Sequence, residues 1–152
     1  MKALLLAAGF GKRLRPITEK IPKCLVTIQK KPLLDYWVNN LSNCNFEALV
    51  INTHYLSAQV RSFVNLHPLK AKIELVHEDV LLGTAGTLRK NIKYFDGEDI
   101  LLAHADNYCT ADFNEFILHH NKRPNDCLIT MMTFITDTPE SCGIVELDGN
   151  GV

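Results

Sequence analysis

A cluster of basic residues lies near the start of the chain, directly after its first apolar run. Seven of the sixteen lysines and arginines fall between positions 12 and 31, where Glu19 is the only acidic residue. Gly9 and Gly11 introduce the cluster, and glycine lets the backbone bring its N–H groups close to a phosphate. These residue types predict a loop that binds a polyanion. The seven cations are Lys12, Arg13, Arg15, Lys20, Lys23, Lys30 and Lys31.

A single aspartate, Asp106, stands just beyond the apolar run 100–103. A carboxylate at the carboxyl end of a strand is placed to hold Mg²⁺, which prefers oxygen ligands and is often bound by few carboxylates together with phosphates. The alternative is an aspartate that only caps the loop after the strand. From its residue type and position, Asp106 can therefore be either a metal ligand or a cap of the loop, and both roles remain open.

The glycine-rich loop does not match two common phosphate-binding patterns. A dinucleotide fingerprint requires a third glycine where Leu14 stands. A Walker A loop requires a glycine at the position of Leu6 and a serine or threonine after Lys12, and neither is present. A solvated basic loop without a ligand remains the alternative on composition alone.

Apolar runs of strand length alternate with segments of helical period along the chain, and this alternation must position the loop and Asp106. It predicts a parallel sheet with helices on both faces and right-handed crossovers. We therefore expect an α/β fold, a Rossmann-like three-layer sandwich with a mostly parallel central sheet, in which ligands bind at the carboxyl ends of the strands. The expected strands are 3–8, 48–51, 72–77, 100–103 and 127–134, and the expected helical stripes are 32–41, 56–64, 88–95 and 110–117, the last capped by Thr110.

The end of the chain predicts a strand over 143–147 and a hairpin turn over 148–151, so that a returning strand would begin at Val152. We expect one domain over 1–152, the nucleotide-binding portion of a fold that is incomplete at its C-terminus. An unpaired sheet edge favours self-association, which predicts a homo-oligomer.

The composition excludes several classes of protein. A formal net charge of −1 argues against a partner that is nucleic acid, and no apolar run is long enough to span a membrane. The five cysteines are odd in number and form no C-x-x-C pair, so free thiols and a cytoplasmic location are expected.

The segment 6–16, with 22–25 and 31–33 beyond it, resembles the signature of sugar-1-phosphate nucleotidylyltransferases, most closely bacterial mannose-1-phosphate guanylyltransferase-like proteins. It reads LAAGFGKRLRP, PKCL and KPL. The resemblance implies that Arg13 neutralises the departing pyrophosphate and that Lys23 contacts the α-phosphate or the sugar phosphate, both as catalytic residues. Lys12 replaces the family's usual threonine, and Cys24 a frequent proline or alanine. The nucleotide-binding residues implied in this loop are Leu6, Ala7, Ala8, Gly9, Gly11, Lys12 and Arg13.

Two further segments resemble the family pattern. The segment 77–88, HEDVLLGTAGTL, implies nucleotide-binding roles for Glu78, Gly83 and Thr84. By the same resemblance Asp106 would hold Mg²⁺, the expected cofactor, and Gly143 would contact the sugar.

The resemblance implies transfer of a nucleoside monophosphate from a nucleoside triphosphate to a sugar-1-phosphate, with GTP and mannose-1-phosphate favoured. A glucose-1-phosphate uridylyl- or thymidylyltransferase is one alternative. Others are a catalytically impaired nucleotide-binding or nucleotide-sensing module, and an NAD-dependent oxidoreductase that lacks its third glycine. The family continues beyond this length with further sugar and metal contacts, so we hypothesise that the chain alone is impaired in catalysis.

Overall fold

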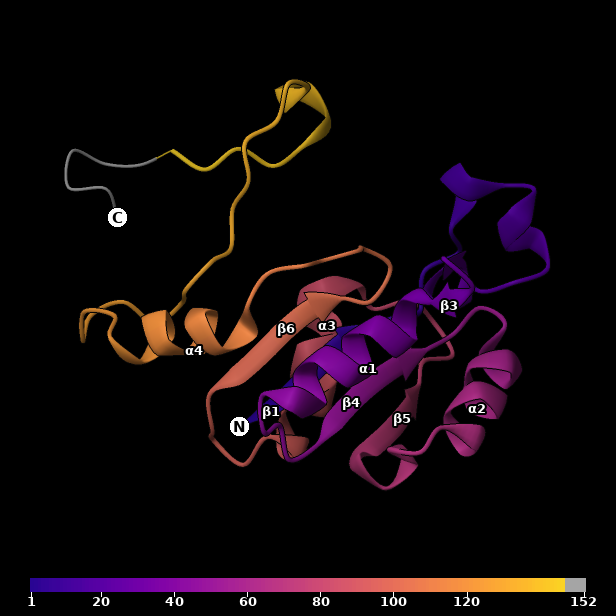
Figure 1. Ribbon diagram of the computed structural model, residues 1–152, viewed down its shortest axis with the longest axis horizontal. Coiled ribbons are helices and arrows are strands. Elements are labelled where there is room, and N and C mark those ends of the chain that lie inside the picture. The colour runs from indigo at the N-terminus through magenta and orange to yellow at the C-terminus, as the bar shows by residue number, and fades with distance from the viewer. Residues whose placement is uncertain (147–152) are drawn as a thin grey trace. The chain divides into compact units, whose positions relative to one another are not determined.

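Four parallel strands form the central sheet, in the order β5-β4-β1-β6. In the computed structural model, which describes residues 1–146, these strands are β1 (Lys2–Leu6), β4 (Leu49–Thr53), β5 (Ile73–His77) and β6 (Ile100–His104) (Figure 1). The chain runs from β1 outward through β4 to β5 and then crosses to the other side of β1 to form β6. The direction of winding therefore reverses at β1, and the predicted fold class is confirmed.

The chain divides into two compact units, Met1–Thr110 and Ala111–Val152. The first contains the whole parallel sheet and its helices. The second begins just before the helix α4 (Phe113–Asn121). The single domain expected over 1–152 stays a prediction.

The central strand β1 is buried along its length because it has a strand on each side and helices on both faces. Ala3, Leu4 and Leu5 are fully buried, as a continuous apolar run predicts for such a strand. The strand was expected to reach position 8 but ends at Leu6. It ends there because the next backbone N–H, that of Ala7, donates to a side chain of β4 instead of to a neighbouring strand.

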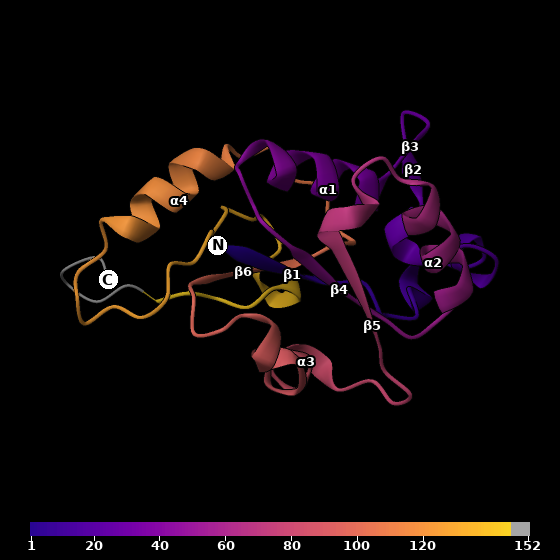
Figure 2. The ribbon, with the colours of Figure 1, turned by 90° about the horizontal axis from the view of Figure 1, so that it is seen from below.

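Helices α1 (Leu33–Asn43) and α3 (Gly83–Asn91) cover opposite faces of the sheet (Figure 2). Helix α2 (Ser57–Leu66) packs beside the edge strand β5. Helix α1 begins directly after Pro32, and the apolar stripe predicted for it is confirmed, because every member is buried. Its members are Leu34, Trp37, Val38 and Leu41.

On the α3 face the core is built around Leu4, Val50 and Phe95. The helical stripe expected over 88–95 is only partly right. Helix α3 ends at Asn91, and a 3₁₀ turn follows over Ile92–Tyr94. This turn leaves the Ile92 side chain exposed while it brings Phe95 into the core.

Three 3₁₀ turns and a short hairpin connect β1 to α1. The turns span Lys12–Leu14, Ile17–Glu19 and Lys23–Leu25. The hairpin pairs β2 (Thr27–Ile28) with β3 (Lys31–Pro32) in antiparallel register. All the predicted basic residues of the loop therefore lie on this one connection.

In the second unit, α4 is capped by Asp112 and not by Thr110 as predicted. The Asp112 carboxylate accepts hydrogen bonds from the backbone N–H groups of Asn114 and Glu115. Asp112 immediately precedes the first helical residue, which is the position from which a side chain can reach these N–H groups.

The predicted strand over 127–134 is wrong. Within the described part of the chain this segment joins no ladder, and its apolar side chains Leu128, Ile129 and Phe134 are largely exposed. Residues 143–146 are also not a strand. The rest of that predicted strand, Leu147, and the predicted turn over 148–151 and Val152 lie outside the described residues.

No helix formed by residues 1–146 is both long enough and apolar enough to cross a membrane. All five cysteines are free thiols. Burial of Cys24, the residue after Lys23, raises the pKa of its thiol to about 12. Its thiol therefore stays protonated and packs as a small apolar group.

Candidate functional site

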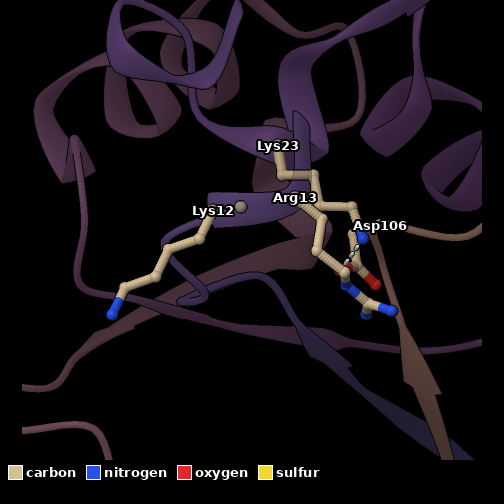
Figure 3. Close-up of a pocket in the computed structure, with 5 residues that line it drawn as sticks. Lys12, Arg13, Lys23 and Asp106 are labelled. Atoms are coloured by element: carbon tan, nitrogen blue, oxygen red, sulfur yellow. Dashed lines mark hydrogen bonds and ion pairs between the residues drawn. The ribbon is translucent and has the colours of Figure 1, made fainter. Parts of the chain in front are cut away.

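A pocket opens at the carboxyl end of β1, beside β6, where the direction of winding reverses. It is lined by Gly11, Lys12, Arg13, Lys23 and Asp106 (Figure 3). Ligands of open α/β sheets bind in the crevice at such a reversal point. The fold therefore brings the basic loop after β1 and the aspartate after β6 to one place.

An ion pair joins the two sides of this pocket. The Lys23 Nζ lies 2.6 Å from the Asp106 Oδ2, and the two side chains are 22% and 28% exposed. A contact of this length between charged groups is a strong hydrogen bond. Each group thus neutralises the charge of the other.

The other two cations of the pocket differ in direction. Figure 3 shows Arg13 extending towards Asp106, whereas Lys12 extends away from it. The Lys12 Nζ lies 5.7 Å from the centre of the Phe10 ring, in a cation–π contact. Both side chains are exposed, so a polyanion in the pocket can reach the guanidinium without rearrangement of the fold.

Gly11 is required by the shape of the loop. Its φ is +64°, and an added Cβ would lie 2.9 Å from the Thr18 Cγ2. The buried Thr18 hydroxyl donates to the Gly11 carbonyl over 2.7 Å, which fixes the turn from the second 3₁₀ segment. The glycine therefore serves both the positive φ and a close side-chain contact.

Two hydrogen bonds hold the segment that carries Asp106. The Ala105 N–H donates to the Leu6 carbonyl over 3.0 Å and so extends the β1–β6 pairing by one step. The Trp37 Nε1–H of α1 donates to the Asn107 carbonyl over 2.8 Å. Asp106 lies between these two anchors, which fixes its carboxylate over the end of β1.

The predicted nucleotide-binding residues at the end of β1 and in the loop after it differ in how far they are buried. Leu6 packs against the α3 core, and Ala7 and Ala8 are buried, so their side chains face protein. Gly9 is exposed, with open space around it. Only the backbones of these residues are placed to meet a ligand, and their roles stay predictions.

The residues predicted from the segment 77–88 do not line the pocket. Glu78 is 1% exposed, and both of its carboxylate oxygens accept hydrogen bonds inside the protein. Gly83, with φ +69°, and Thr84 lie exposed in the first turn of α3. The Glu78 carboxylate oxygens are thus engaged inside the protein, and the nucleotide-binding roles of Glu78, Gly83 and Thr84 stay predictions.

Gly143, predicted to contact the sugar, lies in the second unit beyond the 3₁₀ turn Pro139–Ser141. An added Cβ at this glycine would meet no atom within 4 Å. Its role stays a prediction.

A metal ion in this pocket would have one protein carboxylate. Residues 1–146 contain no group of three or more His, Cys, Asp or Glu side chains suited to hold a metal. Mg²⁺ commonly binds one or two carboxylates and completes its shell with phosphate oxygens and water. The single Asp106 carboxylate among the described residues that line the pocket, with three cations beside it, is a donor set that fits Mg²⁺ carried by a polyphosphate better than a preformed metal centre.

The volume of the pocket, about 160 Å³, is below the roughly 300–1,000 Å³ of pockets that enclose a whole small-molecule ligand. The pocket is therefore suited to the charged end of a ligand, a phosphate chain with its metal.

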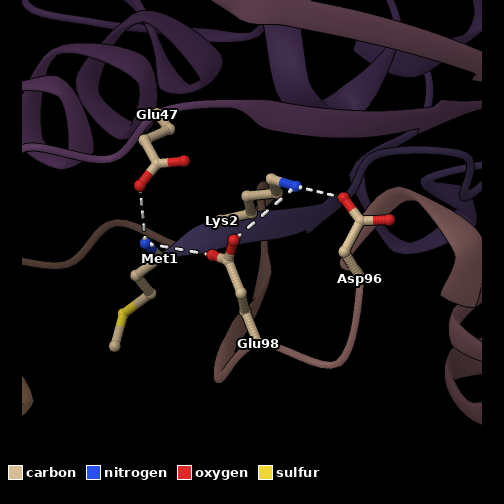
Figure 4. A network of polar contacts seen from close by, with 5 residues as sticks. All are labelled: Met1, Lys2, Glu47, Asp96 and Glu98. Carbon is tan, nitrogen blue, oxygen red and sulfur yellow. Dashed lines mark hydrogen bonds and ion pairs between the residues drawn. The ribbon is translucent and has the colours of Figure 1, made fainter.

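A second group of charges lies at the amino ends of the strands, away from the pocket (Figure 4). The Lys2 Nζ lies 2.9 Å from the Asp96 Oδ2, and the Met1 amine lies within 3.3 Å of carboxylate oxygens of Glu47 and Glu98. The hydrogen bond to Asp96 raises the pKa of Lys2. These contacts tie the start of β1 to the loop before β4 and to the loop before β6. The Lys2 and Met1 amines are therefore already paired with carboxylates.

A parallel α/β sheet with a cationic pocket at its reversal point has the architecture of the doubly wound folds that bind nucleotides at that point. The family model for nucleotidyl transferases matches residues 2–152. The chain therefore belongs to the nucleotidyl transferase family, and the resemblance drawn from the motifs is confirmed at that level.

Among relatives, the chain is 31% identical over 149 residues to a mannose-1-phosphate guanyltransferase of Aspergillus oryzae, covering 95% of this chain and 40% of the relative. It is 28% identical over 166 residues to a UTP–glucose-1-phosphate uridylyltransferase of a Synechocystis strain, covering 99% and 42%. The crystal structure of HddC from Yersinia pseudotuberculosis complexed with GMP-PN superposes with a TM-score of 0.69 at 26% identity, covering 80% and 54%. The chain thus spans less than half the length of these two relatives.

Sequence reasoning missed three polar residues that shape this site. Thr18 lies outside the segments that carry the family resemblance, and Trp37 falls within the apolar stripe predicted over 32–41. Asn52, at the end of β4, drew no attention. For Asn52 the one signal in the sequence is a polar residue near the end of a mostly apolar strand. For Trp37 the sequence gives no sign that the indole N–H donates a hydrogen bond.

Proposed function

We propose that this chain forms the triphosphate-binding part of a sugar-1-phosphate nucleotidylyltransferase. One observation carries the proposal: Arg13, Lys23 and Asp106 line the same pocket at the reversal point of the sheet. Cations that neutralise phosphate charge and a carboxylate that accepts Mg²⁺ are the groups this transfer requires.

In the proposed reaction, a phosphate oxygen of the sugar-1-phosphate attacks the α-phosphorus of the nucleoside triphosphate. The new P–O bond forms as the bond between the α-phosphorus and the α–β bridging oxygen breaks, and pyrophosphate leaves with that electron pair. No protein nucleophile is needed, because positioning and charge neutralisation lower the barrier.

Arg13 would neutralise the leaving pyrophosphate, and Lys23 would contact the α-phosphate or the sugar phosphate. Asp106 would hold Mg²⁺, which when bound neutralises charge on the phosphate oxygens. Lys23 and Asp106 are paired in the nucleotide-free molecule, so a triphosphate with its metal would replace one contact of each. The pocket therefore supplies both charges that the ligand needs, already facing each other.

GTP with mannose-1-phosphate is the favoured pair of substrates, because relatives named for that activity match nearly the whole chain. UTP or TTP with glucose-1-phosphate is the alternative within the same reaction class, and one relative is named as such a uridylyltransferase. The side chains of the pocket contact phosphates and not the base, so they do not discriminate between these pairs.

A nucleotide-binding or nucleotide-sensing module without catalysis is the second candidate function. Such a module would retain triphosphate binding through Lys23 and Arg13 and would release no pyrophosphate.

The test has two parts. Release of pyrophosphate is screened for four nucleoside triphosphates, each with several sugar-1-phosphates and Mg²⁺. Binding of the same triphosphates is compared with binding of NAD. The proposal predicts release with one triphosphate and one sugar phosphate, and a loss of orders of magnitude in the Lys23→Ala variant. Triphosphate binding without release would favour the sensing module. Binding of NAD but of no triphosphate would refute both.

A further inference from the structure

A buried polar network lies beneath the pocket loop, on the α3 face of the sheet. At its centre the Asn52 Oδ1 accepts a hydrogen bond from the Ala7 N–H over 2.7 Å. The same amide donates from Nδ2 to the Glu78 Oε1 over 3.0 Å. Asn52 is 3% exposed, so these bonds form away from water. One side chain of β4 thus holds the first residue after β1.

Glu78 continues the network to α3. The Thr87 hydroxyl donates to the Glu78 Oε1 over 2.6 Å, and the Leu82 N–H donates to Oε2 over 3.2 Å. The His54 Nδ1 lies 2.7 Å from the Glu78 carbonyl. Burial raises the pKa of the Glu78 carboxyl, but the hydrogen bonds that its oxygens accept from Asn52, Thr87 and Leu82 outweigh burial and lower the pKa overall. The carboxylate therefore stays ionised and fixes the residue before α3.

The two segments joined in this way are the two that carry the nucleotide-binding motifs. Ala7 begins the loop that leads to the pocket, and Leu82 immediately precedes Gly83, the first residue of α3. Buried polar groups of this kind are costly unless all are satisfied, and apolar residues could fill the same layer. The network gives the two segments a fixed distance that apolar packing alone would not specify.

We propose that Asn52 and Thr87 are positioning residues of the nucleotide site, which set the phosphate loop and the first turn of α3 in register through Glu78. The proposal rests on the proposed function for the identity of the ligand. It assigns to these side chains no contact with the ligand itself. Their effect on binding passes through the backbone at Ala7 and at Leu82.

The first test measures binding of a non-hydrolysable guanosine triphosphate analogue with Mg²⁺ to the folded chain. Asn52→Ala is compared with Asn91→Ala, because Asn91 is also buried and its side chain makes one hydrogen bond, of 2.9 Å, to the Thr87 carbonyl inside α3. We expect Asn52→Ala to weaken the affinity by roughly tenfold or more, and Asn91→Ala by less than about twofold, at similar losses of stability. Equal effects on affinity would overturn the proposal.

A rescue variant separates positioning from a general loss of packing. Asn52→Asp alone places a second carboxylate 3.0 Å from Glu78 and should weaken binding strongly. Adding Glu78→Gln moves the charge to position 52 and reverses the hydrogen bonds, because the new amide at position 78 can donate to the carboxylate at position 52 and to the Thr87 Oγ1. The Thr87 hydroxyl can then donate to position 52, from which it lies 3.3 Å away. We expect the double variant to recover most of the lost affinity, and no recovery would count against the proposal.

The second test needs no nucleotide and is read by NMR. Thr87→Val removes one hydroxyl in α3 and keeps the side-chain shape. We expect shifts and loss of amide protection in the backbone at Ala7, Ala8 and Gly9, which Thr87 reaches through Asn52, both directly, by the hydrogen bond of 3.3 Å from the Asn52 Nδ2, and by way of Glu78. Changes confined to α3 would refute the positioning role. If these amides respond but no triphosphate binds, the proposed function fails while the structural coupling stands.

Discussion

Replacing Lys23 by glutamine should increase the affinity of the nucleotide-free chain for a divalent metal ion. In the structure the Lys23 ammonium holds one oxygen of Asp106, the single carboxylate of the pocket, over 2.6 Å. A metal ion that arrives alone must displace this ammonium. A metal ion that arrives with a triphosphate gives the lysine a new anionic partner, so we expect metal and triphosphate to bind cooperatively.

The size of the effect follows from the ion pair. A hydrogen bond between charged groups contributes about 1.5–3 kcal/mol, and partial exposure to solvent reduces this to roughly 1–2 kcal/mol. At about 1.4 kcal/mol for each factor of ten, Lys23→Gln should bind a lone metal ion roughly 5- to 30-fold more tightly. In the presence of triphosphate the sign reverses, because the variant has lost a phosphate contact.

The assay is a titration with Mn²⁺, as a paramagnetic substitute for Mg²⁺, followed by electron paramagnetic resonance without nucleotide. Lys12→Gln is the matched control, because Lys12 lines the same pocket and carries the same charge but extends away from Asp106. Asp106→Asn should abolish the binding. Equal gains in Mn²⁺ affinity in the two lysine variants would mean that only the loss of a positive charge matters. Weaker Mn²⁺ binding in Lys23→Gln would refute competition between Lys23 and the metal ion for Asp106.

Three further predictions concern the residues around the pocket. Gly11→Ala should lower the free energy of unfolding, measured by urea denaturation, by about 1–3 kcal/mol, because Gly11 has a positive φ. Gly9→Ala, where the added Cβ meets open space, should change it little, and equal losses in the two variants would contradict this explanation. Since the pKa of Glu78 is lowered on folding, its contribution to stability is present above the unfolded value, near 4.5, and is lost as pH falls through the folded value. The gap in unfolding free energy between the parent and Glu78→Gln should therefore narrow below pH 4.5, and a constant gap would exclude this origin. Trp37→Phe removes the N–H that anchors the segment after Asp106, so triphosphate–Mg²⁺ affinity measured by calorimetry should fall about fivefold, and no change would argue against the anchor.

Much of the fold followed from the sequence because each buried element leaves a pattern in one stretch of chain. The run around Leu4 has the continuous apolar character of a strand covered on both faces, and the stripe through Trp37 has the period of a helix with one buried face. The run 127–134 shows the limit of this reasoning. It has the composition of a strand, but a strand exists only with a partner, and composition does not supply one.

The candidate site was predictable to the extent that it depends on the ends of strands. Parallel strands end at one edge of the sheet, so Lys23, on the connection after β1, and Asp106, after β6, were expected to meet. The hydrogen bonds that link Ala7 to Asn52 and Asn52 to Glu78 were not predictable. They join residues up to 71 positions apart and depend on side-chain direction, which no local pattern encodes.

If the pocket binds a triphosphate together with its metal, a crystal structure of this chain with a non-hydrolysable nucleoside triphosphate analogue and Mg²⁺ will show both there. We expect phosphate oxygens within hydrogen-bonding distance of Arg13 and Lys23, with the metal on Asp106 and the Lys23–Asp106 contact opened. A triphosphate bound elsewhere on the molecule, with that ion pair intact, would contradict this expectation.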